Sequence, residues 1–310
     1  MCTAIADGKR GVTGRTLDVA RRFGEEALLL PRDCPLPWEG GRHLAILGVG
    51  RIEEGTPLLF DGMNERGLWG AALRYPEAVW NGGEGREVPS FALLAEVLGR
   101  CGSIGEARAF LVGTRATNRP FSAALPAAPL HFLFADGEGA LVAEPEREGL
   151  RLWDAPVGVL ANSPSFPAQL SHLSLFSHLG SAPSPCRLCP DLAPAAGSGA
   201  LGLPGDFSSP SRFVRAAFAL RYLRGEGLPF GFAALGQVAV PKGAVENEEG
   251  RHFTVYTSVY DRAKMEMAVL PAGVFCPRTL SLRGREEGRE PLSFSLAWEE
   301  EWEALRPSTT

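Results

Sequence analysis

The chain has 310 residues, of which 45% are hydrophobic, and its formal net charge is -5. A chain of this length and composition can bury a substantial core, and its negative charge argues against a general nucleic-acid-binding protein. No stretch has the apolar length of a transmembrane helix, and residues 2–10 lack the apolar region of a signal peptide. We therefore expect a soluble protein with neither a membrane nor a nucleic-acid partner.

The six cysteines lack the spacing of a disulfide framework, which favours a reducing, cytoplasmic location. Cys186 and Cys189 form a lone CxxC pair, with no second pair and no nearby histidine cluster. Zinc-binding patterns of this type need two such pairs, so we expect no metal and no cofactor. The sequence leaves the role of these two cysteines open.

The alternation of residues 2–6 predicts a β-strand that begins at Cys2, and an Asp-Gly turn predicts a hairpin that returns through 12–18. This return would bring Arg15 and Asp18 toward Cys2. Removal of the initiator methionine would leave a thiol and an α-amine on one residue, groups that titrate at about 8.5 and about 7.7–8.0. A guanidinium would stabilise the thiolate and a carboxylate would orient the amine. A frayed, solvated terminus is the alternative.

The next part of the chain predicts a layer of strands followed by two helices. Short apolar or β-rich runs predict strands at 26–31, 43–51, 56–61 and 67–74. Helical spacing of apolar residues predicts helices at 89–98 and 104–111, with Ser103 as the N-cap of the second. Strands resume at 130–134, 140–144, 149–152 and 157–161. The order of strands, helices and strands predicts an α+β fold with antiparallel sheets.

The second half begins with a predicted helix at 166–178. The Pro/Ser/Gly-rich run that follows, 181–205, predicts a loop or mobile lid, or equally a surface insertion. A Ser-Pro start then predicts a helix from 208 onward, with an apolar face that contains Phe213, Ala216, Ala217, Leu220 and Leu223. Arg212 lies in its first turn, where the helix dipole disfavours a cation. This position indicates a role for Arg212 outside the helix.

Two more strands, at 253–259 and 265–270, complete the predicted fold. The tail, 283–310, is charged and carries Trp298 and Trp302 among glutamates, which predicts a short helix with a solvated acidic face. We expect a single domain that covers 2–310.

Asn162 and His131 are polar residues next to or inside apolar strands. Read alone, Asn162 fits an Asx-turn before a proline better than it fits an oxyanion donor. His131 fits a core histidine whose polar atoms find partners. A Ser/His/Asp hydrolase would need a Gly-x-Ser-x-Gly elbow at a strand-to-helix turn, and the sequence has none there.

Five segments acquire a further meaning from their order along the chain. They are MCT at 1–3, GRTLD at 14–18, DGMNERGL at 61–68, GVLANSPSF at 158–166 and LPGDFSSPSRF at 203–213. Together they resemble the choloylglycine hydrolase family, which contains the conjugated bile salt hydrolases and the penicillin V acylases. The resemblance implies the N-terminal nucleophile hydrolase fold, a four-layer αββα sandwich of two antiparallel sheets between helical layers.

The resemblance also implies a catalytic site. Cys2 would be the nucleophile, and its own α-amine would accept the thiol proton. Arg15 would lie beside the thiol and Asp18 on the amine. Asn162 would donate to the oxyanion, and Arg212 would hold the group together by charge-assisted hydrogen bonds.

Arg74 is a departure from the family pattern. The bile salt hydrolases that this chain resembles carry Asn at this position, and penicillin V acylases usually carry Tyr. The backbone N–H of Arg74 could still serve the oxyanion hole. Its side chain would suit an anionic leaving group, such as the carboxylate of glycine or the sulfonate of taurine.

We therefore predict a cytoplasmic cysteine amidohydrolase that cleaves a small-molecule amide, a glycine- or taurine-conjugated bile salt, and by resemblance a homotetramer. Runner-up activities are those of a penicillin V acylase, an N-acyl amino acid acylase or an N-acyl homoserine lactone acylase. Alternatives of other classes are a non-catalytic binding protein on the same scaffold and a metal module based on the CxxC pair.

Overall fold

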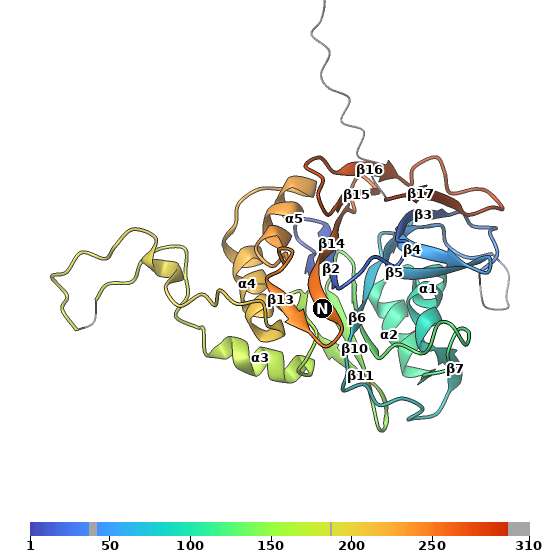
Figure 1. Cartoon of the computed structure of the whole chain (residues 1–310), viewed down its shortest axis with the longest axis horizontal. Coiled ribbons are helices and arrows are strands. Elements are labelled where there is room, and N and C mark those ends of the chain that lie inside the picture. Colours follow the sequence, from blue (N-terminus) through green and yellow to red (C-terminus); the bar gives the residue numbers. More distant parts are fainter. Residues whose placement is uncertain (37–41, 187, 297–310) are drawn as a thin grey trace, which may run out of the picture.

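Two antiparallel sheets stacked face to face form the centre of the structure, and helices cover their outer faces (Figure 1). The computed structural model describes residues 1–36, 42–186 and 188–296. In this part of the chain the elements follow the predicted order of strands, helices and strands. The α+β, four-layer arrangement expected from the sequence is confirmed.

The first sheet has the strand order β12-β1-β2-β14-β15-β16, with β13 paired to β14. Its strands are β1 (Cys2–Asp7), β2 (Val12–Val19), β12 (Val159–Leu160), β13 (Val245–Asn247), β14 (Gly250–Asp261), β15 (Glu266–Pro271) and β16 (Arg278–Ser281). Helices α4 (Ser209–Tyr222) and α5 (Gly227–Gly236) pack on this sheet, and α3 (Phe166–Ser174) packs on α4.

The second sheet has the strand order β11-β10-β9-β6-β5-β4-β3-β17. Its strands are β3 (Glu26–Leu30), β4 (Ile46–Glu53), β5 (Thr56–Asn64), β6 (Trp69–Arg74), β9 (Leu130–Ala135), β10 (Ala140–Glu146), β11 (Gly149–Asp154) and β17 (Leu292–Ser295). Helices α1 (Ser90–Arg100) and α2 (Ile104–Val112) pack on it, flanked by the short parallel pair β7 (Arg86–Pro89) and β8 (Thr114–Thr117). Ser103 caps α2 as predicted, accepting a hydrogen bond from the backbone N–H of Glu106.

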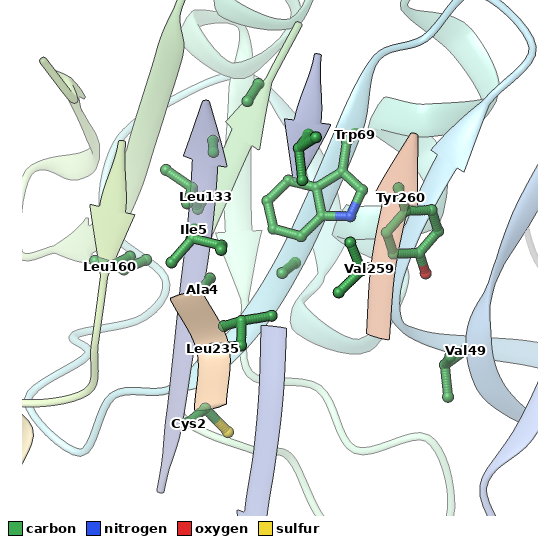
Figure 2. Packing of buried hydrophobic residues seen from close by; sticks show 14 of the residues in the cluster. Cys2, Ala4, Ile5, Val49, Trp69, Leu133, Leu160, Leu235, Val259 and Tyr260 are labelled. Carbon is green, nitrogen blue, oxygen red and sulfur yellow. The ribbon is translucent and has the colours of Figure 1, made fainter. Parts of the chain in front are cut away.

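The apolar core forms two clusters, which the second sheet separates. The larger cluster joins the two sheets to α4 and α5, and the smaller one lies between the second sheet and the helices α1 and α2. Figure 2 shows part of the larger cluster, which includes Ala4 and Ile5 of β1, Leu160 of the neighbouring β12, and Leu133 and Trp69 of the second sheet. Both faces of the central strands are therefore buried, which explains why β1 is apolar on both sides.

The N-terminal hairpin forms as predicted, with Ala4 of β1 opposite Arg15 of β2. Because alternate residues of a strand face opposite sides, Cys2 and Arg15 share one face of the sheet. Arg15 contacts carbonyls of the second sheet, so this face looks into the space between the sheets. Thr3 and Asp18 face the other way, toward α4.

Some elements differ from the sequence predictions. Helix α3 ends at Ser174 and does not reach residue 178. Helix α5 was not predicted, because its sequence GLPFGFAALG is rich in residues that weaken helices. Gly231 explains part of this composition: a Cβ there would lie 2.3 Å from Cγ1 of Val259, so only glycine lets α5 approach β14 this closely. The short strands β7, β8, β13, β16 and β17 were also missed.

The two irregular regions behave differently. In the tail 283–310, β17 pairs with β3 where no strand was predicted, and the helix predicted around Trp298 and Trp302 lies outside the described residues. The described part of 181–205 contains one short 3₁₀ turn, Ser198–Ala200, and extends away from the sheets in Figure 1. Its mobility stays a prediction. Within the described residues, no helix combines the length and the apolar character needed to span a membrane.

Candidate active site

Cys2 lies at the start of β1, with only 3% of its surface exposed. Nη2 of Arg15 donates a hydrogen bond to its Sγ at 2.7 Å. A guanidinium at this distance favours the thiolate over the thiol. The predicted neighbourhood of Cys2 and Arg15 is therefore present in the structure.

Arg15 is itself buried, with an exposed fraction of 1%. Its Nη1 donates to the backbone carbonyls of Phe60 at 3.0 Å and Ala72 at 2.8 Å. Burial lowers the pKa of Arg15, but its electrostatic interactions with Cys2, Tyr256 and Asp61 outweigh this effect, so the net pKa is raised. The guanidinium is thus a fixed, permanent cation beside the thiol.

Asn162 follows β12 and connects three parts of the site. Its Oδ1 accepts hydrogen bonds from the backbone N–H of Cys2 at 2.6 Å and from Nη2 of Arg212 at 2.9 Å. Its Nδ2 donates to the carbonyl of Arg74 at 2.8 Å. Since both partners of Oδ1 are donors and the partner of Nδ2 is an acceptor, the carboxamide has one consistent orientation. One hydrogen of Nδ2 remains for a substrate oxyanion.

Arg212 reaches the site from the first turn of α4 and is fully buried. Besides Asn162, its Nη1 donates to the carbonyl of Cys2 at 2.5 Å and to Oγ1 of Thr3. Burial lowers the pKa of Arg212, whereas the charges of Asp18 and Cys2 oppose this change. The sequence indicated a role for Arg212 outside its helix, and these contacts supply it.

Asp18 is fully buried on β2 and lies 3.7 Å from Nη1 of Arg212. Its carboxylate accepts hydrogen bonds from Oγ1 of Thr254 at 2.6 Å and of Thr16 at 3.1 Å. The backbone N–H of Asp18 donates to the carbonyl of Met1, and the amine of Met1 donates to the carbonyl of Asp18. With Met1 attached, the N–H of Cys2 therefore bonds Asn162, and the carboxylate of Asp18 bonds the two threonines.

Arg74 lies at the end of β6, and its backbone and side chain have separate contacts. Its carbonyl holds Asn162, whereas its guanidinium Nη1 lies 2.9 Å from Oε1 of Glu249 in the turn between β13 and β14. The side chain is about half exposed.

A family model described as "Linear amide C-N hydrolases, choloylglycine hydrolase family" matches residues 2–267. The chain belongs to the choloylglycine hydrolase family. The matched range contains all the residues of the site described above. A hydrolase of linear amide C–N bonds needs a nucleophile, a proton acceptor and oxyanion donors.

Individual relatives agree with this family. The chain is 34% identical over 282 residues to a bile salt hydrolase/transferase of Lactiplantibacillus plantarum, covering 85% of this chain and 87% of that one. It is 31% identical to a conjugated bile acid hydrolase of Lactobacillus acidophilus, covering 84% and 89%. The crystal structure of a mutant conjugated bile acid hydrolase from Clostridium perfringens superposes with a TM-score of 0.86 and 27% identity, covering 96% and 97%.

A penicillin V acylase from Agrobacterium tumefaciens shares the fold, with a TM-score of 0.72 and 19% identity over 96% of this chain and 92% of that one. The choloylglycine hydrolase member described here thus has the N-terminal nucleophile hydrolase fold that the sequence resemblance implied.

Other residues discussed from the sequence lie outside this choloylglycine hydrolase site. Cys186 and Cys189 lie in the extended segment and are partly or fully exposed. Across the described ranges, no group of three His, Cys, Asp or Glu side chains could hold a metal ion. His131 is buried on β9, as predicted, with Nδ1 3.1 Å from Oε1 of Glu144 and its ring stacked on Tyr75. The expectation that its polar atoms find partners holds for Nδ1 only, because Nε2 is buried without a hydrogen-bond partner among the described residues.

Asp61 and its partners on β14 were missed. The side chain of Asp61 is buried between the sheets and lies 3.9 Å from Nε of Arg15. A charged residue inside an otherwise apolar strand was a visible signal. Alternating hydroxyl residues at Tyr256, Ser258 and Tyr260 were a second one, since alternate residues share a face.

Proposed function

We propose that this protein is a cysteine N-terminal nucleophile amidohydrolase that cleaves the amide bond of glycine- or taurine-conjugated bile salts. The observation that carries the proposal is the 2.7 Å contact between Sγ of Cys2 and Nη2 of Arg15, inside a site whose backbone is held by Asn162 and Arg212. The names of the family's bile acid hydrolases support the substrate class.

The first chemical step requires a free α-amine on Cys2. Removal of Met1 exposes this amine, which accepts the proton of the thiol while Arg15 stabilises the resulting thiolate. The carboxylate of Asp18 then orients the ammonium, and Arg212 fixes the backbone of Cys2 through its carbonyl. The intact mass of the protein should accordingly equal that of the chain without Met1.

The thiolate attacks the amide carbonyl and forms a carbon–sulfur bond, and the carbonyl electrons move onto oxygen. The free hydrogen of Asn162 Nδ2 and the backbone N–H of Arg74 are the proposed donors to this oxyanion. Collapse of the intermediate breaks the carbon–nitrogen bond, and the ammonium of Cys2 gives its proton to the leaving amine. Water then hydrolyses the thioester, with the amine of Cys2 as base, and regenerates the thiol.

We further propose that the protein works as a cytoplasmic homotetramer with a single domain over 2–310. Support for an assembly comes from the described part of the segment 181–205, which extends away from the sheets and exposes Leu188, Leu192 and Leu201. Light scattering coupled to size exclusion measures the oligomeric state, and a monomer would contradict this part of the proposal.

The deciding experiment measures release of glycine from glycocholate and of taurine from taurocholate by the purified protein, beside the Cys2→Ala variant. Release by the wild type alone is the expected result. No release by a protein that has lost Met1 would favour penicillin V, N-acyl amino acids or N-acyl homoserine lactones as substrates. The specific reason for these alternatives is Arg74, which stands where bile salt hydrolases carry Asn. Binding without turnover of any amide would support the non-catalytic alternative.

A further inference from the structure

A second charged cluster lies on the other edge of the Arg15 guanidinium. Oδ2 of Asp61, on β5, is 3.9 Å from Nε of Arg15 and accepts a hydrogen bond from the hydroxyl of Tyr256 at 2.6 Å. Oδ1 of Asp61 accepts from Oγ of Ser258 at 2.8 Å and from the hydroxyl of Tyr260. One carboxylate thus receives three hydroxyl donors and faces the cation that contacts Cys2.

The strand pairing explains how these groups meet. Tyr256, Ser258 and Tyr260 are alternate residues of β14, so their side chains leave the same face of the first sheet. Ser258 is the cross-strand neighbour of Arg15, which shows that this face looks toward the second sheet. Asp61 comes from the second sheet and completes the cluster from the opposite side.

Arg15 is seated by the backbone of the second sheet independently of Asp61. The pairing of β5 with β6 ends at Asp61 and Ala71, and Phe60 is the extra residue of a bulge between β4 and β5. The carbonyls of Phe60 and Ala72, just beyond this point, both accept from Nη1 of Arg15. Because these acceptors belong to the backbone, a substitution of the Asp61 side chain does not remove them, and we expect the guanidinium to keep its position.

Charge is what Asp61 adds to this arrangement. Burial raises the pKa of Asp61 overall, although Arg15 and the three hydroxyl donors oppose that rise. The geometry favours the ionised form, since both carboxylate oxygens accept hydroxyl hydrogen bonds and one of them faces the guanidinium. Burial also raises the pKa values of Tyr256 and Tyr260 well above the usual range, so both tyrosines stay protonated as donors. Asp61 and the thiolate of Cys2 are then two anions that share one cation.

We propose that Asp61 is a positioning residue that acts on Cys2 through Arg15, by neutralising part of the guanidinium charge that the thiolate experiences. The proposal rests on the proposed function, because it takes Cys2 as the nucleophile. Its consequence is chemical: a thiolate that is stabilised too strongly is a weaker nucleophile. Asp61 keeps the thiol basic enough to attack an amide.

Several titratable groups surround Cys2 and Arg15, and the test has to isolate one of them. They are Asp18 of β2, Arg212 of α4, Tyr256 of β14 and Asp61 of β5, with the amine of the first residue. Asp61→Asn removes one charge and keeps the shape of the side chain. Asp261→Asn is the matched control, since Asp261 is also a buried carboxylate but lies at the far end of β14, opposite Val12.

The experiment measures the rate of alkylation of Cys2 by iodoacetamide as a function of pH in the full-length protein. Cleavage after Lys9 yields the peptide 2–9, whose only cysteine is Cys2, so mass spectrometry separates it from the other five cysteines. In Asp61→Asn the midpoint should fall by about one pH unit, because Arg15 loses its counter-charge. The limiting rate above the midpoint should fall about threefold. Asp261→Asn should keep the wild-type midpoint.

A midpoint in folded Asp61→Asn that equals or exceeds that of the wild type would overturn the proposal. Should this variant fail to fold, Tyr256→Phe carries the test. It removes the hydroxyl on Oδ2 of Asp61, the oxygen that faces Arg15, and leaves the carboxylate more negative. Its midpoint should rise by a smaller amount, and a fall or an unchanged value would overturn the proposal. Alkylation needs no amide substrate. The profiles of Asp61→Asn and Tyr256→Phe can therefore be interpreted even if the proposed substrate class is wrong.

Discussion

Nη1 of Arg74 and Oε1 of Glu249 lie 2.9 Å apart, so the guanidinium next to the site is paired with a carboxylate of its own chain. Arg74 and Glu249 are 49% and 50% exposed, and the carbonyl of Arg74 holds Asn162. An anionic leaving group such as glycine would have to compete with Glu249 for this cation.

Glu249→Gln should therefore lower KM for glycocholate, with kcat little changed. Exposed ion pairs contribute about 0–1 kcal/mol, which corresponds to an effect of at most about fivefold. Glu246→Gln is the matched control, because Glu246 lies in the same hairpin and pairs with Arg251. Arg74→Asn should reduce the preference for anionic over neutral leaving groups. If KM in Glu249→Gln and the leaving-group preference in Arg74→Asn both stayed at their wild-type values, the side chain of Arg74 would have no part in specificity.

Asn162→Ala should lower kcat by a factor of about 10²–10³, the usual effect of losing one oxyanion donor. The variant also removes the contacts that join Cys2, Arg212 and Arg74. Steady-state kinetics on the best amide substrate measure the effect. The neighbouring Ser163 bonds Glu77 near the surface, so Ser163→Ala should keep the wild-type kcat. Equal losses in the two variants would indicate a disturbed loop and no specific role for Asn162.

Arg212→Met should destabilise the fold by about 3–5 kcal/mol, because it leaves the buried carboxylate of Asp18 without its cation. Urea unfolding followed by circular dichroism gives the free energy of unfolding. Arg221→Met, an exposed position on the same helix, serves as the comparison. A free energy of unfolding within 1 kcal/mol of the wild type for Arg212→Met would mean that Thr254, Thr16 and the α-amine of Cys2 satisfy Asp18 without Arg212.

Asp206 should make the start of α4 sensitive to acid. Hydrogen bonds from the side chains of Ser208 and Ser211, with the backbone of Ser208, lower its pKa from 3.8 to about 2. A carboxylate whose pKa is depressed by folding stabilises the native state above its unfolded pKa, and the contribution is lost as pH falls from about 4 to about 2. Thermal melting at several pH values should show this loss in the wild type and a flatter profile in Asp206→Asn. A profile of the same steepness in the variant would assign the acid sensitivity to other carboxylates.

The sequence predicted the local parts of the site well and the contacts between layers poorly. The hairpin that unites Cys2 and Arg15 follows from strand alternation and an Asp-Gly turn, both of which are local signals. Arg212 was visible because a cation in a first turn opposes the helix dipole. Asp61 was missed because its meaning depends on β14, nearly two hundred residues later, and no local pattern specifies which sheet faces which. Asn162 needed the family resemblance, since its isolated pattern favoured an Asx-turn.

The register shift in β14 between Thr254 and Tyr256 has a consequence for how substitutions combine. Val255 is an extra residue, so Thr254 faces Asp18 on the helix side and Tyr256 faces Asp61 on the inter-sheet side, although they are two positions apart. In a regular strand these two side chains would share a face and their free-energy effects would be coupled. With the bulge, changes at the two positions should be energetically independent. One inserted residue thus allows the surroundings of the amine to vary without disturbing those of the thiolate.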